Sequence, residues 1–149
     1  MLKKIICTVL TGFTLSLAAQ AQTVMPTELP TKQLNVGIHL IQAEVAQTYA
    51  QRAKGLMFRE TMGSNQGMVF VFDKKEASCM WMKNTLIPLS VAFLDDDGTI
   101  LNIEDMQPQT ETNHCARAPM RYALEMNLGW FKNKGIKSGS KIAGLPAYQ

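Results

Sequence analysis

The sequence predicts a small, mainly β domain, either a compact β-barrel or a sandwich, with one short helix after the first strands. Short apolar runs separated by turn-forming residues recur from Leu34 to the end of the chain. The segment 49–57 is helix-competent and follows a capping pattern. Strands and helices do not alternate along the chain, so a doubly wound parallel sheet is not expected.

Period-two alternation predicts the first strands. Apolar residues alternate with polar ones from Leu34 to Leu40, as in a half-buried strand. Gly37 divides this stretch into two short strands, of which the second continues through Val45. Thr48 and Gln51 then have the spacing of a capping box, which predicts where the helix begins.

The later elements are less regular. The run Gly67–Phe72 is apolar on both faces, which predicts a central strand. Two apolar runs on either side of Asp97-Gly98 predict a β-hairpin. The remaining expected elements are strands at 79–85, 122–126 and 141–144, a helical turn at 129–134 and a long surface loop at 107–119.

The N-terminal residues have the pattern of a secretory signal. Two lysines precede an apolar run from Ile5 to Leu17, and Ala19-Gln20-Ala21 provides a cleavage site of small residues. This run is shorter than the roughly 20 residues that cross a bilayer, so no stable membrane insertion is expected after signal cleavage. We expect a signal peptide at 1–21, a flexible leader at 22–32, one globular domain at 33–149 and an exported protein, periplasmic or secreted.

The charge of the exported protein is close to neutral. The chain has 15 basic and 12 acidic side chains, and the signal removes two of the lysines. The other lysines and arginines are scattered along the sequence, without the clustered basic face of a nucleic-acid-binding protein. No nucleic-acid partner is therefore expected.

Several separate motifs carry a family resemblance. They are Gly55-Leu56-Met57-Phe58-Arg59, Gly67-Met68-Val69-Phe70-Val71-Phe72, the segment Cys79–Leu89, Ala123-Leu124-Glu125-Met126-Asn127 and Gly135-Ile136. In this order they closely resemble the family known as domain of unknown function 192, over roughly residues 33–144. The resemblance implies no established activity.

The segment Cys79–Leu89 is called the signature segment below. On strand geometry, Trp81 and Lys83 share one face, while Asn84 lies on the other face with two methionines. One hypothesis is that Trp81 provides a stacking wall and that Lys83 and Asn84 bind an anionic or carbonyl group. The alternative is structural: Lys83 covers apolar surface and Asn84 fixes a turn.

Glu125 is the acidic candidate, because it falls within an otherwise apolar strand. A carboxylate at this position either faces solvent or pairs with a base such as Lys83, Arg52 or Arg59. A cleft shared by Lys83 and Glu125 would allow acid–base chemistry. A solvated or paired structural glutamate is the other interpretation.

Cys79 and Cys115 remain after signal cleavage. An even pair of cysteines in an exported protein predicts a disulfide. The alternative is a catalytic or metal-binding thiol, for which His114 is the obvious neighbour.

No metal or cofactor is expected. The methionines around Trp81 suit copper(I), but methionines within apolar runs usually fill a core. The acidic turn before Gly98 fails as a calcium loop, because Phe93 stands where the first acidic ligand should be. Templates for phosphate loops, nucleophile elbows and zinc helices are also missing from the sequence.

The sequence therefore predicts a binding or accessory module with a cleft near Met80–Asn84, which recognises an unidentified small molecule or extended ligand. The candidate ligand-binding residues are Trp81, Lys83, Asn84, Glu125 and Arg59. One alternative is a hydrolase- or lyase-type enzyme that uses Lys83, Asn84 and Glu125. The other is a structural protein of the cell envelope.

Overall fold

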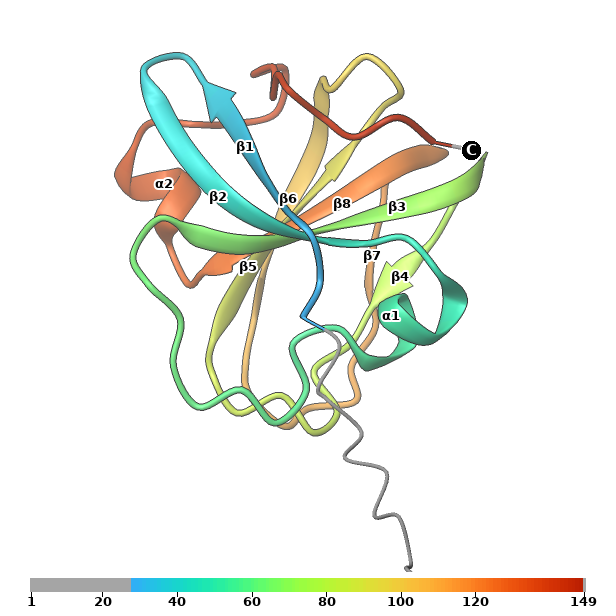
Figure 1. Cartoon of the computed structure of the whole chain (residues 1–149), viewed down its shortest axis with the longest axis vertical. Helices are drawn as coiled ribbons and strands as arrows, with labels where there is room; N and C mark the ends of the chain where they lie inside the picture. Colours follow the sequence, from blue (N-terminus) through green and yellow to red (C-terminus); the bar gives the residue numbers. More distant parts are fainter. Residues whose placement is uncertain (1–27, 149) are drawn as a thin grey trace, which may run out of the picture.

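The computed structural model describes residues 28–148. The predicted signal peptide and most of the predicted leader lie outside the described residues. The strands are β1 (Thr31–Val36), β2 (His39–Ala46), β3 (Gln66–Glu76), β4 (Cys79–Met80), β5 (Leu89–Leu94), β6 (Ile100–Met106), β7 (His114–Cys115) and β8 (Met120–Asn127), and the helices are α1 (Tyr49–Lys54) and α2 (Trp130–Asn133) (Figure 1).

The mainly β prediction is confirmed, and the short helix α1 follows the first two strands as expected. Six strands form one sheet in the order β1-β2-β3-β8-β5-β6, and β4 pairs with β7 in a second, two-stranded sheet. The sheets are not closed into a barrel. β2 and β3 pair in parallel because α1 and the connection after it return the chain to the same end of the sheet, whereas the other pairs are antiparallel.

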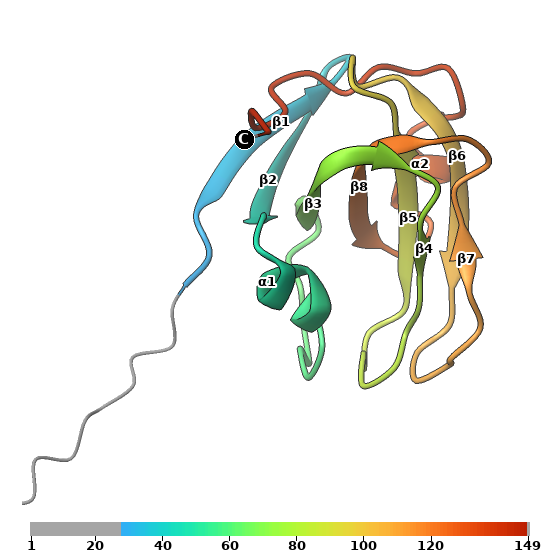
Figure 2. The ribbon, with the colours of Figure 1, turned by 90° about the vertical axis from the view of Figure 1, so that its right-hand side faces the viewer.

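Both faces of the large sheet are covered, which explains the two-sided apolar pattern of β3. One face carries a core with Val69, Leu124 and Phe131, to which α2 and the C-terminal segment contribute. We call the other face the site face. Its core includes Met68, Phe70, Val91, Phe93 and Ala123 from the sheet, and Leu56, Met82 and Ile87 from the covering loops. Figure 2 shows α1, β4 and β7 arranged along this side of the sheet.

The local signals at the helix start are confirmed. The Thr48 hydroxyl accepts a hydrogen bond from the Gln51 backbone N–H, and the Gln51 side chain accepts one from the Thr48 N–H, forming the expected capping box. Gly55 ends the helix with a φ of 47°. This conformation favours glycine, and the Phe70 ring lies 3.2 Å from where a Cβ would stand. The helix therefore ends before Met57, where the sequence pattern placed its end.

Two strand predictions are wrong. The signature segment is a strand only as far as Met80 and then becomes a loop, because its turn forms other backbone hydrogen bonds, described below. The stretch 141–144 forms only isolated bridges, between Lys141 and Thr99 and between Ala143 and Asn35. The chain also joins β1 at Thr31, two residues before the predicted start of the domain.

No helix within residues 28–148 is long and apolar enough to cross a membrane.

Candidate functional site

A disulfide fixes the start of the signature segment. Cys79 and Cys115 are direct partners in the β4–β7 pair, and their sulfur atoms are bonded at 2.05 Å. The predicted bridge is therefore present in the structure, and neither cysteine is a free thiol there. It connects the first residue of β4 to the last residue of β7.

The signature segment continues as a tight turn, Met82–Thr85, which we call the signature turn. The Thr85 N–H donates to the Met82 carbonyl at 3.0 Å, and Asn84 has a φ of 56°. Met82 is fully buried in the core of the site face, which anchors the turn. Because the turn breaks the strand, the expected division of these side chains between two faces does not apply.

Three backbone hydrogen bonds tie the signature turn to two other loops. The Met82 N–H donates to Thr110, the Gln109 N–H donates to Thr85, and the Phe58 N–H donates to Asn84, at distances of 2.8 to 3.0 Å. The last bond connects the turn to the Gly55–Arg59 motif.

Phe58, Asn84 and Gln109 are also the three non-glycine residues with positive φ among residues 28–148. Residues with unfavourable backbone angles tend to gather at functional sites, where the surrounding structure holds them in place.

Trp81 and Lys83 both lie on the surface of the signature segment. The Lys83 ammonium group stands 5.3 Å from the centre of the Trp81 ring, within range of a cation–π interaction. It also lies 3.6 Å from the Glu111 carboxylate. Trp81 is 45% exposed, which leaves a substantial part of the ring open to a ligand.

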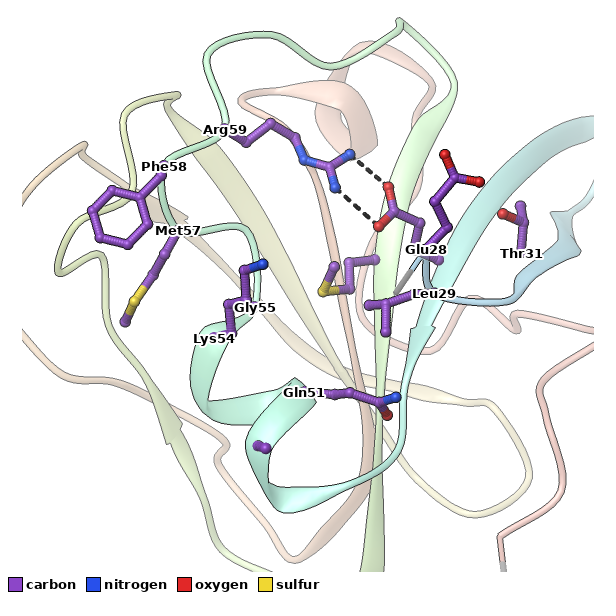
Figure 3. Close-up of a pocket in the computed structure, with 12 residues that line it drawn as sticks. Glu28, Leu29, Thr31, Gln51, Lys54, Gly55, Met57, Phe58 and Arg59 are labelled. Atoms are coloured by element: carbon purple, nitrogen blue, oxygen red, sulfur yellow. Dashed lines mark hydrogen bonds and ion pairs between the residues drawn. The ribbon is translucent and has the colours of Figure 1, made fainter. Parts of the chain in front are cut away.

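An open cleft of about 1020 Å³ lies beside this region. It is bounded by the chain entering β1, by β2 and β3, by α1 and by the Gly55–Arg59 motif (Figure 3). Its lining combines apolar and charged side chains from these elements: Glu28, Leu29, Thr31, Glu44, Ala50, Gln51, Lys54, Gly55, Met57, Phe58, Arg59 and Met68.

An ion pair crosses the cleft. Arg59 donates two hydrogen bonds to the Glu44 carboxylate on β2, of 2.5 and 2.9 Å, drawn as dashed lines in Figure 3. Two parallel bonds of this kind fix the guanidinium group in direction as well as position. In the same view Phe58 and Met57 point away from the Arg59 side of the cleft, and Phe58 is 66% exposed.

Glu125 lies on β8 within the site face. It is 4% exposed, with Met68 on β3 and Val91 on β5 as its direct cross-strand neighbours. Burial raises the pKa of its carboxyl group to about 8. Neither alternative drawn from the sequence holds among residues 28–148: Glu125 does not face solvent, and it pairs with no base, since the three candidate bases bind other carboxylates. Lys83 pairs with Glu111, Arg52 with Asp73 and Arg59 with Glu44.

The structure thus divides the candidate residues into three places. Trp81, Lys83 and Asn84 are on the exposed signature segment, Arg59 is in the cleft, and Glu125 is beneath the surface of the site face. The backbone hydrogen bond between Phe58 and Asn84 connects the signature segment to the cleft.

Sequence reasoning missed Glu44, and it expected a cleft near Met80–Asn84, whereas the cleft described here is lined by α1, β2, β3 and the Gly55–Arg59 motif. The signal for Glu44 was weak, because a single glutamate in the half-buried strand β2 is typical of a solvent-facing position. It becomes recognisable only when β2 and Arg59 are brought together in space.

Within residues 28–148, no group of three or more His, Cys, Asp or Glu side chains is placed to hold a metal ion. The structure therefore supplies no candidate metal centre in the described part of the chain.

Fold and site together define a small, open-sheet β domain with a disulfide-tied signature turn beside a cleft. The family model for domain of unknown function 192, described as "Uncharacterized ACR", matches residues 31–144, and the chain belongs to this family.

Two solved structures are similar to it. One is a "putative transcription regulator" from Sinorhizobium meliloti 1021, with 35% identity, a TM-score of 0.76, and coverage of 79% of this chain and 98% of that one. The other is a protein of unknown function from Novosphingobium aromaticivorans DSM 12444, with 36% identity, a TM-score of 0.75, and coverage of 89% and 99%. No match to a curated protein was found.

Proposed function

We propose that the chain is an exported binding or accessory module whose cleft holds a small molecule or an extended ligand. The observation that carries this proposal is the open cleft, with its apolar walls and the Arg59–Glu44 ion pair across it. Ligand sites are typically concave and mainly apolar, with a few fixed polar groups that orient the ligand. A guanidinium group held by two bonds is such a group.

The position of the signature turn supports the same location for the ligand site. The Phe58–Asn84 backbone bond places the turn next to the wall of the cleft, and all three strained non-glycine residues of the described chain meet there. Beyond Phe58, the half-exposed Trp81 ring and the Lys83 ammonium group extend this surface with an aromatic and a cationic contact. We propose that a ligand longer than the cleft also contacts these two side chains.

The enzyme hypothesis receives less support from the geometry. Lys83 and Asn84 are exposed on a loop, whereas Glu125 is buried and makes no ion pair with Lys83. An acid–base pair needs its two groups within reach of one reacting atom.

Export rests on the predicted signal peptide. The Cys79–Cys115 disulfide supports it, since such bonds persist mainly in oxidising compartments. Export and the expected lack of a nucleic-acid partner stay predictions.

Native mass spectrometry of protein purified from its native compartment tests the binding role. We expect the wild type to carry a bound small molecule, and Phe58→Asn to carry less of it, because the Phe58 ring at the edge of the cleft is removed while asparagine tolerates the positive φ.

The matched control is Ile38→Asn, which alters a 92% exposed apolar side chain between β1 and β2, at the other end of β2 from the cleft. A bound molecule retained equally by Phe58→Asn, or lost equally from Ile38→Asn, would contradict binding at this cleft.

A further inference from the structure

One row of side chains crosses the site face from strand to strand. The pairing register aligns Glu44 on β2, Met68 on β3, Glu125 on β8, Val91 on β5 and Glu104 on β6. Residues paired in this way project from the same face of a sheet, about 5 Å apart from one strand to the next. Glu44 and Met68 line the cleft, so Glu125 is the next side chain inward from its floor.

The three acidic side chains in this row differ in the contacts that the rest of the protein makes with them. Glu44 receives two hydrogen bonds from Arg59, and Glu104 accepts one from Asn102 at 3.0 Å and lies 3.9 Å from Arg117. Glu125 is the most buried of the three, and among residues 28–148 burial is the one cause of its raised pKa, with no hydrogen bond or ion pair to its carboxyl group. Buried polar groups without partners are rare, and each one requires an explanation.

We propose that Glu125 is the inner anchor of the cleft and selects ligands that carry a protonated amine on an apolar chain. This inference rests on the proposed binding function of the cleft. The apolar part of such a ligand fits against Leu29 and Met68, and the ammonium group supplies the charge that the protein itself does not provide at Glu125.

Two properties of the site favour a cation. A charge-assisted hydrogen bond is about twice as strong as a neutral one, so a buried carboxyl group gains more from an ammonium group than from a hydroxyl. The pKa of about 8 lies near neutral pH, so a bound cation needs to lower it only slightly for the carboxylate to form.

The charged groups facing Glu125 along the row are Glu44 with Arg59 on one side and Glu104 on the other. Met68 alone stands between Glu125 and the cleft in this row, and its flexible thioether can move aside without leaving a polar group unpaired.

Matched probes test the inference. Purified, folded protein is titrated with 1-hexylamine and with 1-hexanol at pH 7, and binding is followed through the NMR amide signals of Met57, Phe58 and Arg59. We expect the amine to bind at least about tenfold more tightly than the alcohol, a difference of 1.4 kcal/mol. Glu125→Gln should bring the two affinities to within about twofold, whereas Glu104→Gln, the control from the same row, should leave the preference unchanged.

A second measurement needs no variant. The carboxyl carbon signal of Glu125 in the wild type should report a pKa that falls when hexylamine is bound and stays constant with hexanol.

Equal affinities for both probes in the wild type, or an unchanged Glu125 titration with bound amine, would overturn the inference while leaving the cleft as a binding site. Binding of neither probe at the cleft would count against the inference and against an apolar-ligand function together.

Discussion

At the scale of single residues, the conformation of Asn84 explains why an amide side chain occupies the signature turn. Its φ of 56° is costly for most L-residues, by about 1–2 kcal/mol, and asparagine and glycine tolerate it best. The Asn84 side chain is exposed, so its loss removes little packing.

We therefore expect Asn84→Ala to lower the free energy of unfolding by about 1 kcal/mol and Asn84→Gly to change it by less than about 0.5 kcal/mol. Urea unfolding of the two variants measures the difference. Equal destabilisation by both would show that the side chain itself, and not the backbone angle, is what the turn requires.

Glu125 makes stability depend on pH. Its pKa is raised from 4.5 to about 8 in the folded chain, so the folded state holds this proton more tightly than the unfolded state does. The resulting stabilisation is fully present below about pH 4.5 and is lost as the pH rises towards 8.

Between pH 5 and pH 9 the unfolding free energy of the wild type should fall by a few kcal/mol, on the order expected for a shift of this size. Glu125→Gln, which has no proton to lose, should flatten the decline. Chemical unfolding at several pH values provides both curves, and parallel curves would mean that Glu125 titrates normally in the folded protein.

At the scale of elements, Gly67 determines how closely β3 and β8 approach. A Cβ at this position would collide with the Glu125 carbonyl and the Met126 sulfur on β8. Only the lack of a side chain allows the central pair of the sheet to form there, next to the cleft floor at Met68.

Gly67→Ala should therefore cost at least about 2 kcal/mol of stability, because the Glu125 carbonyl belongs to the backbone and cannot rotate away from the added methyl group. Gln42→Ala, an exposed change on the neighbouring strand, should cost less than about 0.5 kcal/mol. Thermal unfolding compares the pair, and similar melting temperatures would contradict the collision.

The two-stranded sheet depends on its disulfide. β4 and β7 pair through only two residues each, and the bond between Cys79 and Cys115 closes a separation of 36 residues. A loop of this size corresponds to a stabilisation of roughly 4 kcal/mol as an upper figure, because it restricts the unfolded chain.

The double variant Cys79→Ser/Cys115→Ser should lose up to that amount of unfolding free energy. Its amide protons should also exchange faster at 79–86 and 107–116, where the two loops meet. Mass analysis of the folded wild type without reductant should find no free thiol. Two alkylatable cysteines in the folded protein would refute the bridge.

At the scale of the whole molecule, the elements with local signals were predicted well. The capping box placed the start of α1, the two-sided apolar run placed β3 in the centre, and the turn at Gly98 placed the β5–β6 hairpin. The signature segment was predicted as a strand because its residues have strand propensity. Long-range backbone bonds to Phe58, Gln109 and Thr110 hold it in a turn instead.

The site was predictable only in part, for the same reason. Arg59 and Glu125 could be selected from the sequence as charged groups in apolar surroundings, but their partners could not. Glu44 lies on β2, whereas Arg59 follows 15 residues later in the loop after α1, and the pairing considered between Lys83 and Glu125 does not form. Such pairs are set by how loops and strands pack in space, which local patterns do not encode.

The sequence alone determined the family, the mainly β class and the pair of cysteines, because these depend on residue type, periodicity and short spacing. Only the tertiary structure decided that Arg59 binds Glu44 across a cleft, that the signature segment turns, and that Glu125 is buried without a partner among residues 28–148. The physical reason is that each of these features depends on which strands and loops, far apart in the sequence, lie side by side. That order follows from the packing of the whole chain.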